Sequence, residues 1–540
     1  MVADTSIDTF FNVFNFSKSA WEPLIEPWQL GFHMAKDQSP DRLSVELYSR
    51  KSLELTVTSA TIALASKSAQ FLSDDEDVLS KPRGSDAPYR MKNYTGFDVN
   101  VWAESHSDEG TTANLTDGEE IPWRFADAST ARENLSPEGT IGVIGIKLEG
   151  SGFDSIERIP VNREGEALYN LKPRKDKVQH RLLVEVKLGA DNVKNITLRS
   201  PLLVENNTQI PIEIGVFSPE EGTLLKIVKI APEEARPSPV GACFMHSLVI
   251  RPDQGFGYTW SNERLFWKEL IKRPTRTITC QGEQRDQSPP FYFQMNAAFD
   301  KNDPLTSVYP FMRLRLSAPV EIQNLLPFDF KYRIYDKNTK KDWTNFLRRG
   351  GVSPVHVVEL SHLLLMSIDM QDTPFKQSEF AIINSSDRED FKREKSVMVK
   401  DNHDLTLRLK LHYYNIPDSG GAFKVAVFSP YIVLNRTGLE LDVRGKSFFG
   451  SAKTAAGQGT FANTDEQGVR KALPFMFSFP TDDRKNRALI KLGESNWSKP
   501  VSFDAIGSTS DVTLSAASGR AEMHAGLTVE EGEGKVKSTY

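Results

Sequence analysis

A fourteen-residue pattern occurs four times in this chain, and it limits the possible folds more than any other feature of the sequence. The copies read PYRMKNYTGFDVNV, PLLVENNTQIPIEI, PVEIQNLLPFDFKY and PYIVLNRTGLELDV, and they align without a gap. Each copy holds one aligned asparagine: Asn93, Asn206, Asn324 and Asn435. The intervals are 113 (206 − 93), 118 (324 − 206) and 111 (435 − 324) residues, so the chain is a tandem array of similar units.

The pattern itself predicts a strand, a turn and a second strand. A proline lies five residues before each asparagine, where its missing N–H group costs little at the start of a strand. Apolar residues lie four and two positions before the asparagine and four, six and eight positions after it. This alternation is typical of strands with one buried face. The asparagine therefore marks the corner of a hairpin in each unit.

The length of the period favours a complete domain in each unit. Propeller blades and helical repeats take about 33–50 residues, whereas a period near 110 fits a two-sheet sandwich. Alternating segments such as HRLLVEVKLG and DLTLRLKLHYY fill the space between the asparagines. We expect an all-β fold, a tandem array of about four β-sandwich modules in an elongated curved row. A propeller of six or more blades is the alternative.

The repeat predicts five segments along the chain. Residues 1–80 form an N-terminal β segment and linker that packs on the first module, with one candidate helix at 59–72. The modules span 81–195, 196–312, 313–425 and 426–540, the last with a C-terminal tail. A weaker repeat supports this division: Trp260-Ser261 and Trp497-Ser498 stand at the same spacing before a phenylalanine, and the third copy keeps only Ser378 and Ile383.

The four asparagines are the candidate site residues, and two interpretations remain open. An asparagine side chain accepts hydrogen bonds from backbone N–H groups two residues on and tolerates positive φ, so it can fix a hairpin corner. The second interpretation is that the corners also face a shared groove that binds a peptide. The two are compatible, because a fixed corner can shape a groove.

Composition and motifs exclude several function classes. The net charge of −6 argues against a general binder of nucleic acid or anionic membranes. Two cysteines, Cys243 and Cys280, cannot staple a chain of 540 residues, which indicates a reducing, cytoplasmic compartment. The start MVADTSIDTF lacks the regions of a signal peptide, and no apolar run reaches the roughly 20 residues that span a bilayer.

The sequence also lacks the motifs of catalytic sites. The nine histidines show no HExxH spacing, and there is no CxxC, no Walker loop and no GxSxG elbow. We therefore expect no enzyme, no catalytic residue, no metal site and no cofactor. An alternative from another class is an array that binds carbohydrate or another ligand through the aromatic segment 256–270. It predicts that Trp260 or Trp267 is exposed in a shallow groove.

The segment FNFSKSAWEPLIEPW (14–28), followed by modules that each carry one such asparagine, resembles a known family. It is similar to the adaptor-binding (VAB) domain of the vacuolar protein sorting thirteen family of bridge-like lipid transfer proteins. The resemblance implies a targeting module that binds Pro-x-Pro motifs of membrane-anchored adaptors. It also implies an upstream lipid-transfer rod in the same polypeptide, no direct membrane binding, a monomer, and a peripheral location at organelle membranes and membrane contact sites.

Two further expectations follow from this resemblance. The family's domain has about six repeats, so four copies predict its N-terminal part, and an adaptor groove in later repeats would be absent from this chain. The segment WEPLIEPW (21–28) holds two prolines and two tryptophans, which predicts an extended segment that packs edgewise and breaks strand pairing.

Overall fold

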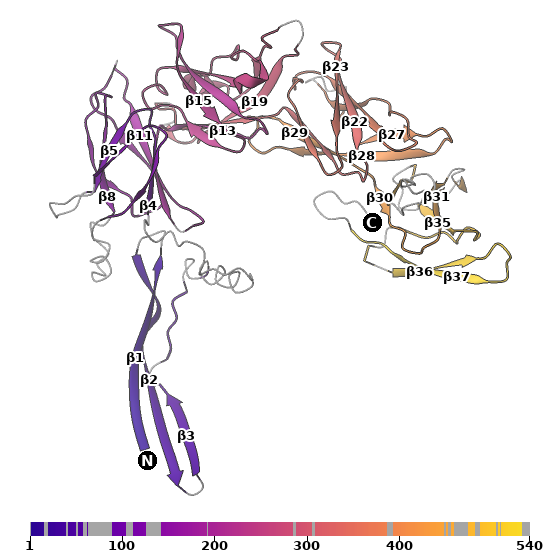
Figure 1. Cartoon of the computed structure of the whole chain (residues 1–540), viewed down its shortest axis with the longest axis horizontal. Coiled ribbons are helices and arrows are strands. Elements are labelled where there is room, and N and C mark those ends of the chain that lie inside the picture. The colour runs from indigo at the N-terminus through magenta and orange to yellow at the C-terminus, as the bar shows by residue number, and fades with distance from the viewer. Residues whose placement is uncertain are drawn as a thin grey trace. The chain divides into compact units, whose positions relative to one another are not determined.

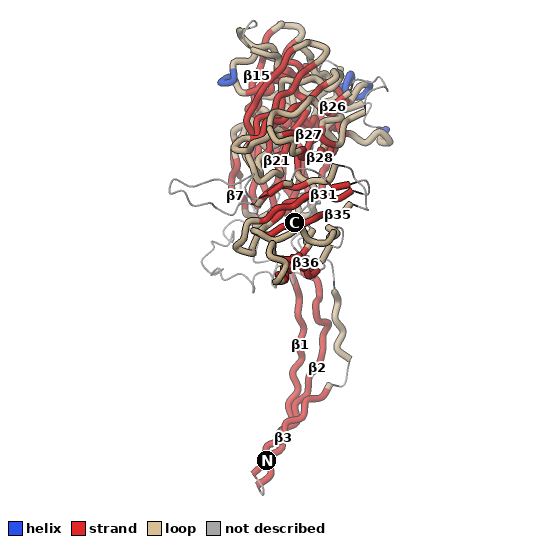
Figure 2. Tube along the Cα trace, turned by 90° about the vertical axis from the view of Figure 1, so that its right-hand side faces the viewer, coloured by secondary structure: helices blue, strands red, loops and turns tan. Residues whose placement is uncertain are grey.

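The chain is all-β, as the computed structural model shows. It describes residues 2–15, 20–38, 41–49, 52–57, 62, 89–103, 112–125, 142–175, 177–191, 193–284, 288–304, 308–385, 392–447, 450–451, 455–457, 474–480, 486–503, 506–507 and 509–531. Strands account for most of the regular structure in these ranges, and helices are short and few (Figure 2). Apart from residue 62, the candidate helix at 59–72 lies outside the described residues.

The chain forms two compact units. One comprises Met1–Leu203 with Arg236–His246 and Pro304–Met312, and the other comprises Val204–Ala235, Ser247–Asp303 and Arg313–Tyr540. The sheets within them are those of tandem β-sandwich modules, as the repeat predicts. The predicted segment boundaries and the predicted shape of the row stay predictions.

An antiparallel three-stranded sheet begins the chain: β1 (Val2–Asn15), β2 (Ala20–Gln38) and β3 (Asp41–Tyr48) (Figure 1). The expectation that WEPLIEPW breaks strand pairing is wrong, because residues of this segment pair with β1: Trp21 pairs with Phe14 and Trp28 pairs with Thr9. Register shifts lie between Thr9 and Phe11 and between Phe11 and Asn12, opposite the stretch that holds Pro27 and Pro23. Prolines cannot donate to a ladder, so strands accommodate them at bulges, and that is the outcome here.

The first module consists of two sheets around one core. Their strand orders are β10-β11-β12-β4-β7 and β6-β5-β8-β9 (Figure 1). Buried apolar residues from both sheets, such as Met91 and Ile146, form a single cluster. The strands are β4 (Tyr89–Tyr94), β5 (Val99–Ala103), β6 (Thr112–Leu115), β7 (Glu120–Trp123), β8 (Val143–Leu148), β9 (Ile156–Pro160), β10 (Gly165–Asn170), β11 (Arg181–Leu188) and β12 (Lys194–Arg199).

The second module repeats this plan with sheets in the orders β16-β13-β20-β19-β18 and β15-β14-β17. A short helix, α3 (Trp267–Lys272), and a 3-10 turn, η2 (Gln254–Phe256), lie between strands of the two sheets along the chain. The strands are β13 (Leu202–Asn206), β14 (Ile212–Ser218), β15 (Thr223–Ile230), β16 (Ala235–Pro237), β17 (Ser247–Pro252), β18 (Thr275–Cys280), β19 (Phe291–Ala298) and β20 (Met312–Ser317).

The third module has the orders β24-β21-β29-β28-β27 and β23-β22-β25-β26. In the first and third modules, the strand that holds the asparagine pairs parallel with the last strand of its module, β4 with β12 and β21 with β29. The strands are β21 (Val320–Asn324), β22 (Phe330–Asp336), β23 (Lys341–Leu347), β24 (Val352–Val355), β25 (Leu364–Met370), β26 (Ala381–Asn384), β27 (Ser396–Lys400), β28 (Thr406–Asn415) and β29 (Phe423–Phe428).

The fourth repeat is divided into smaller sheets. β30 pairs with β34, β36 pairs with β37, and β31 pairs with β32, β33 and β35. Its apolar residues continue the core of the third module, since one buried cluster runs from Val320 to Leu514. The strands are β30 (Tyr431–Val433), β31 (Leu441–Ser447), β32 (Gly450–Ser451), β33 (Ala456–Gly457), β34 (Phe475–Phe477), β35 (Arg487–Leu492), β36 (Thr509–Ser515) and β37 (Glu522–Thr528).

The weaker repeat has a structural explanation in its serines. Ser261, Ser378 and Ser498 each accept a hydrogen bond from the backbone N–H of a buried isoleucine, at 3.1, 2.9 and 3.0 Å. Each serine N–H also donates to the carbonyl of that isoleucine, at 2.8 Å. The serine therefore replaces a strand neighbour at the same place in three modules, which explains why it recurs while the tryptophan before it does not.

Candidate functional site

The asparagine corners are built alike. Asn93 Oδ1 accepts hydrogen bonds from the backbone N–H and the hydroxyl of Thr95, at 3.1 and 2.8 Å. Its Nδ2 donates to the carbonyls of Phe97 and Leu115, at 2.7 and 3.0 Å. The side chain thus closes its own turn and also holds the end of β6, 22 residues later in the chain.

Asn206 and Asn324 repeat this network. Asn206 binds Thr208 through Oδ1 and the Ile210 carbonyl through Nδ2, at 2.6–3.0 Å. Asn324 accepts from the N–H of Leu326 and donates to the carbonyls of Phe328 and Leu347, at 2.9–3.1 Å. The backbone is held as well. The N–H and C=O groups of all three asparagines bond the turn before the fourth strand, as in the bonds of Asn324 to Gly351 and Gly350 at 2.9 and 2.8 Å.

Burial separates these three corners from the fourth. Asn93, Asn206 and Asn324 are completely buried, so their side chains cannot touch a bound peptide. Asn435 is half-buried, and it bonds Thr437 and the Leu439 carbonyl at 2.5–3.0 Å. The neighbouring Leu434 and Leu439 are 50% and 46% exposed. Each asparagine lies in its own module, and no hydrogen bond among the described residues joins two of them.

A loop after the fourth strand of one module lies against the preceding module. In the first unit, Val240 is buried in the core of the first module and donates its N–H to the Thr95 carbonyl at 2.8 Å. Pro239 lies so close to Gly96 that an added Cβ atom would be 2.8 Å from it. Gly96 also has a φ of 87°, which favours glycine. This contact is therefore made directly at the Asn93 corner.

His356 makes the corresponding contact between the second and third modules. Its carbonyl accepts from the Tyr292 N–H at 2.7 Å, and its Nδ1 lies 2.9 Å from the Tyr292 carbonyl. The imidazole stacks on Phe291 with ring centroids 4.2 Å apart. Desolvation by burial lowers the pKa of His356 to about 4, because a charged ring loses its hydration there. At neutral pH the ring is an uncharged part of the junction.

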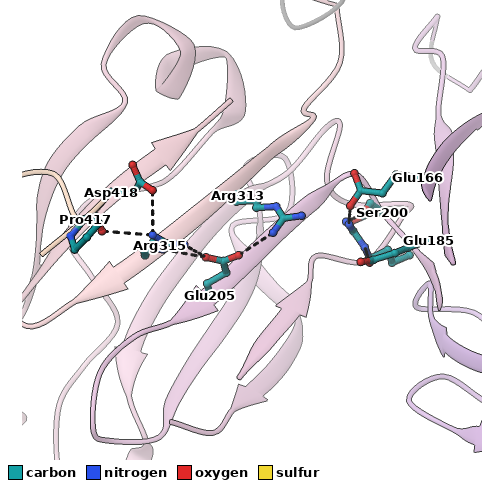
Figure 3. Close-up of polar contacts among 9 residues, drawn as sticks. Glu166, Glu185, Ser200, Glu205, Arg313, Arg315, Pro417 and Asp418 are labelled. Carbon is teal, nitrogen blue, oxygen red and sulfur yellow. Dashed lines mark hydrogen bonds and ion pairs between the residues drawn. The ribbon is translucent and has the colours of Figure 1, made fainter. Parts of the chain in front are cut away.

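Charged residues form pairs within modules, and one of them, Arg315, also reaches the next module. Glu205, the residue before Asn206, lies between Arg313 and Arg315, with oxygen–nitrogen distances of 3.4 and 3.0 Å (Figure 3). Arg315 also reaches Asp418 at 3.3 Å, in the loop between β28 and β29. In the first unit, Arg199 is almost fully buried and binds Glu166 and Glu185 at 2.9 Å each. Pairs of this kind fix orientation more than they add stability.

The third and fourth modules leave a cleft at their junction. Ser478, which follows β34, accepts from the Arg408 N–H at 2.8 Å. Nearby, a cleft of about 520 Å³ opens beside the Asn324 corner. Its wall has an apolar part and a charged rim: Pro327, Phe328, Pro474, Asp329, Arg349, Gln371 and Asp372. No ion pair of the Arg349 side chain is found among the described residues, so its guanidinium can receive an acidic group.

The aromatic segment at 256–270 does not form the exposed platform that a carbohydrate site requires. Trp267 is buried, with 4% of its surface exposed. Trp260 is half-buried, and the Arg251 guanidinium covers it at 4.3 Å from the ring centroid. The exposure of Trp267 that the carbohydrate alternative requires is therefore not found. Core packing holds this ring because a large apolar surface gains more from burial than from hydration.

Sequence reasoning missed His356, Glu205 and the cleft beside Asn324. The residue before each asparagine differs between copies, and the residue that directly follows β7, β16, β24 and β34 is not constant: it is Arg124, Ser238, His356 and Ser478. His356 contacts a neighbouring module, whereas Glu205 binds Arg315 of its own module, which in turn reaches Asp418 of the next. No local signal in the sequence marks these junction residues.

Together, the sheets, the four corners and the junction loops define a tandem β-sandwich repeat domain. The sequence matches the family model "Vacuolar-sorting associated protein 13, adaptor binding domain" over residues 127–540. It is 52% identical over 546 aligned residues to the intermembrane lipid transfer protein VPS13 of Chaetomium thermophilum, a match that covers 99% of this chain and 17% of that protein. The chain belongs to the VPS13 adaptor-binding domain family.

More distant relatives give the same result. The chain is 22% identical to VPS13C of Mus musculus and 24% identical to VPS13A of the same species, over 94% and 92% of its length. It covers 14% and 16% of those proteins, so it spans about one sixth of the length of the relatives it matches. None of the helices in the described part of the chain is long and apolar enough to cross a membrane.

Proposed function

We propose that this chain is a non-enzymatic targeting module that recruits a longer lipid transfer protein to organelle membranes by binding adaptor proteins. Its family carries the description "adaptor binding domain", and its relatives are named intermembrane lipid transfer proteins. The lipid-transfer activity then belongs to an upstream rod of the same polypeptide. The module itself is a cytoplasmic monomer that meets membranes through its adaptors at contact sites.

The adaptor segment carries a Pro-x-Pro motif. Prolines present rigid apolar faces and lose little entropy when they are ordered, so they suit a shallow cleft lined with aromatic and proline side chains. The cleft beside the Asn324 corner has such a wall in Pro327, Phe328 and Pro474. The rim adds the Arg349 guanidinium, which suits an acidic residue next to the motif. The buried asparagines shape this cleft and do not contact the peptide.

Fluorescence anisotropy with a labelled Pro-x-Pro peptide tests this function. The resemblance led us to expect the adaptor groove in later repeats, whereas this proposal places a Pro-x-Pro site in the cleft beside Asn324. The full chain should therefore bind the peptide, and replacement of both prolines with alanine should weaken binding about ten-fold or more. Arg349→Glu should weaken binding, while Lys341→Glu, at an exposed position of β23 outside the cleft, should leave it unchanged. Equal binding of both peptides would contradict the motif. Proline-dependent binding that Arg349→Glu leaves intact would place the site elsewhere.

The indirect membrane contact has its own test. The chain alone should not sediment with vesicles of 30% phosphatidylserine, because its net charge is −6 and like charges repel. Vesicles that carry a tethered Pro-x-Pro peptide should capture it. Analytical ultracentrifugation should give a single species with the mass of one chain. Capture by plain vesicles would assign the membrane contact to the module itself.

A further inference from the structure

The chain contains a Pro-x-Pro segment of its own, Pro237-Ser238-Pro239, at the end of β16. The N–H group between the prolines, that of Ser238, donates to the Leu202 carbonyl at 2.9 Å. The N–H group after them, that of Val240, donates to the Thr95 carbonyl at 2.8 Å. The prolines therefore fall at alternate positions of the segment, where no donor is required. Val240 is fully buried and belongs to the core of the first module.

This segment docks on the turn at residues 93–97, the first corner. Pro239 lies against Gly96, because a Cβ atom added to the glycine would be 2.8 Å from the Cβ atom of the proline. Gly241 lies against the ring of Phe97, since a Cβ atom added to Gly241 would be 3.3 Å from it. The first corner therefore holds a Pro-x-Pro segment that is followed by an apolar residue and a glycine.

The turn at residues 435–439, the fourth corner, has the same geometry. The N–H and the hydroxyl of Thr437 bond the asparagine Oδ1 at 3.0 and 2.7 Å, and the Leu439 N–H bonds Thr437 Oγ1 at 3.2 Å. The equivalent bonds of the first corner measure 3.1, 2.8 and 3.2 Å. Gly438 has a φ of 77°, close to the 87° of Gly96. The two corners thus present the same backbone surface.

The fourth corner is uncovered, whereas the first is covered. Thr95 is completely buried, but Thr437 is exposed, and Leu439 is 46% exposed. A Cβ atom added to Gly438 would meet no atom within 4 Å in the part of the chain that the structure describes. The Thr437 carbonyl accepts no hydrogen bond from the described residues, whereas the Thr95 carbonyl accepts one. The fourth corner therefore offers the surface of the first without its occupant.

We propose that the fourth corner is a second binding site for a Pro-x-Pro segment of an adaptor, which docks there as Pro237-Ser238-Pro239 docks on the first corner. The second proline lies on Gly438, and the next residue donates its N–H to the Thr437 carbonyl. That residue is apolar and packs beside the exposed Leu439. The inference rests on the proposed function for the identity of the partner, and it adds a site to the cleft beside Asn324, which consists of other residues.

Charge determines which residue precedes the first proline. In the first corner, the Arg236 guanidinium lies over the Tyr94 ring, 4.6 Å from its centroid. The fourth corner has Arg436 in place of this tyrosine, and its side chain is exposed. Arg436 forms no ion pair with the described residues. A guanidinium at this position repels a cation and attracts a carboxylate. The motif that suits the fourth corner is therefore acidic, proline, any residue, proline, apolar.

Labelled peptides that copy residues 233–242 test the charge argument on the full chain by fluorescence anisotropy. The peptide with Arg236→Glu should bind at least ten-fold more tightly than the native sequence. Arg436→Glu in the chain should reverse this order. Both measurements are made with Arg349→Glu in place, which removes the preference of the cleft for an acidic residue. An order of affinities that Arg436→Glu leaves unchanged would overturn the assignment of the site.

Methylation of the peptide backbone tests the hydrogen bond to Thr437. N-methylation of the peptide valine removes the N–H group that the Thr437 carbonyl accepts, and it should weaken binding at least ten-fold. N-methylation of the peptide serine is the matched control, because the Ser238 N–H bonds Leu202 of its own module and not the first corner. It should leave the affinity unchanged. The same effect from both methylations would contradict the proposed docking.

Gly438→Ala tests the contact of the second proline. The added methyl group occupies the place of the proline ring, so the peptide with Arg236→Glu should lose at least ten-fold in affinity. Gly519→Ala is the matched control, because Gly519 lies in the same module, has a φ of 71° and also has open space around it. It should leave binding intact. Equal losses in the two variants would overturn the contact.

Crosslinking separates this inference from the proposed function. A photoreactive leucine in place of the peptide valine should crosslink to residues 436–439, and Gly438→Ala should abolish that product. Crosslinks to the cleft beside Asn324 alone would overturn this inference and leave the proposed function standing. Crosslinks to the fourth corner alone would support this inference and contradict the cleft. No crosslink to either, with a dimer that Gly438→Ala disrupts, would identify a second copy as the occupant and overturn the inference.

Discussion

At the scale of the residue, the side chain of one asparagine in each module forms hydrogen bonds with several backbone groups. Asn324 bonds its own turn, the end of β23 and the turn before β24, while it is fully buried. A buried amide of this kind is stable only because every polar atom has a partner. This explains why asparagine recurs: a shorter or apolar side chain would leave several carbonyl and N–H groups without partners in the core.

Asn324→Ala should lower the free energy of unfolding of the third module by about 2–3 kcal/mol, because it leaves buried carbonyls unbonded. Asn435→Ala should cost less, about 1 kcal/mol, since Asn435 is half-buried and water can replace its bonds. Denaturant unfolding followed by hydrogen exchange per module measures both. If Asn324→Ala kept full stability and lost only peptide binding, the asparagine would be a contact residue and the structural interpretation would be wrong.

His356 makes the junction of the second and third modules sensitive to acid. Its pKa is about 4 in the folded chain and near 6.5 when unfolded, so the unfolded state binds the proton more readily between these values. Its contribution is complete above pH 6.5 and is lost as the pH falls toward 4, by about 3 kcal/mol in total. The melting temperature of the wild type should fall steeply as the pH is lowered over this range. His356→Phe should make the melting temperature depend less on pH. An unchanged slope would contradict this.

At the scale of the element, the junctions depend on loops that approach the neighbouring module closely. The loop between β28 and β29 bonds β19 through the Gly420 carbonyl and Gln294 Nε2 at 2.8 Å. Its Asp418 reaches Arg315 on β20. The loops after the fourth strands make the contacts of Val240, His356 and Ser478. Loops at the same place in the fold thus serve the junctions with different residues.

Gly420 and Gly421 allow a controlled test of this docking. Both have positive φ, so an alanine is strained at either position by about 1–2 kcal/mol. Only at Gly420 would the added Cβ atom also clash, at 2.6 Å from Thr275 Cγ2 and 3.0 Å from the Met295 carbonyl. Gly420→Ala should therefore accelerate exchange in β18 and β19, and Gly421→Ala should not. Equal acceleration in both variants would mean that backbone strain, and not the clash, controls exchange in β18 and β19.

At the scale of the whole molecule, the modules differ in how they share their cores. The first module has a core of its own, whereas one buried cluster continues from the third module into the fourth. Repeat proteins are stabilised by their units and by contacts between neighbours, so a shared core should couple the two units it spans. The chain also spans about one sixth of the length of the relatives it matches.

Phe330→Ala tests this coupling. Phe330 is fully buried in the shared cluster, and its removal should cost about 3–5 kcal/mol. Amides of β31 and β35 in the fourth module should then exchange faster, along with those of β22. The matched change in the first module, Ile146→Ala, should leave β31 and β35 at their wild-type rates. If amides of β31 and β35 exchanged at wild-type rates in Phe330→Ala, the shared cluster would not couple the stability of the two modules.

The sequence by itself determined the local order of this protein. Alternation with period two set the strands, and a pattern repeated around Asn93, Asn206, Asn324 and Asn435 set the array and its family, because both signals depend on neighbours in the chain. It also placed prolines in β2, although not the bulges that keep the strand paired. The predicted segment boundaries and the Pro-x-Pro motif remain predictions.

Only the tertiary structure decided the junctions. The bonds of His356 to Tyr292 and of Arg315 to Asp418 join residues 64 and 103 positions apart, and the cleft beside Asn324 takes Pro474 from the next repeat. No local pattern encodes such contacts, since each needs only complementary shape and charge on two surfaces that differ at every junction. The pattern of buried residues recurs because each module has the same arrangement of strands. The junction residues vary because each module contacts a different neighbour.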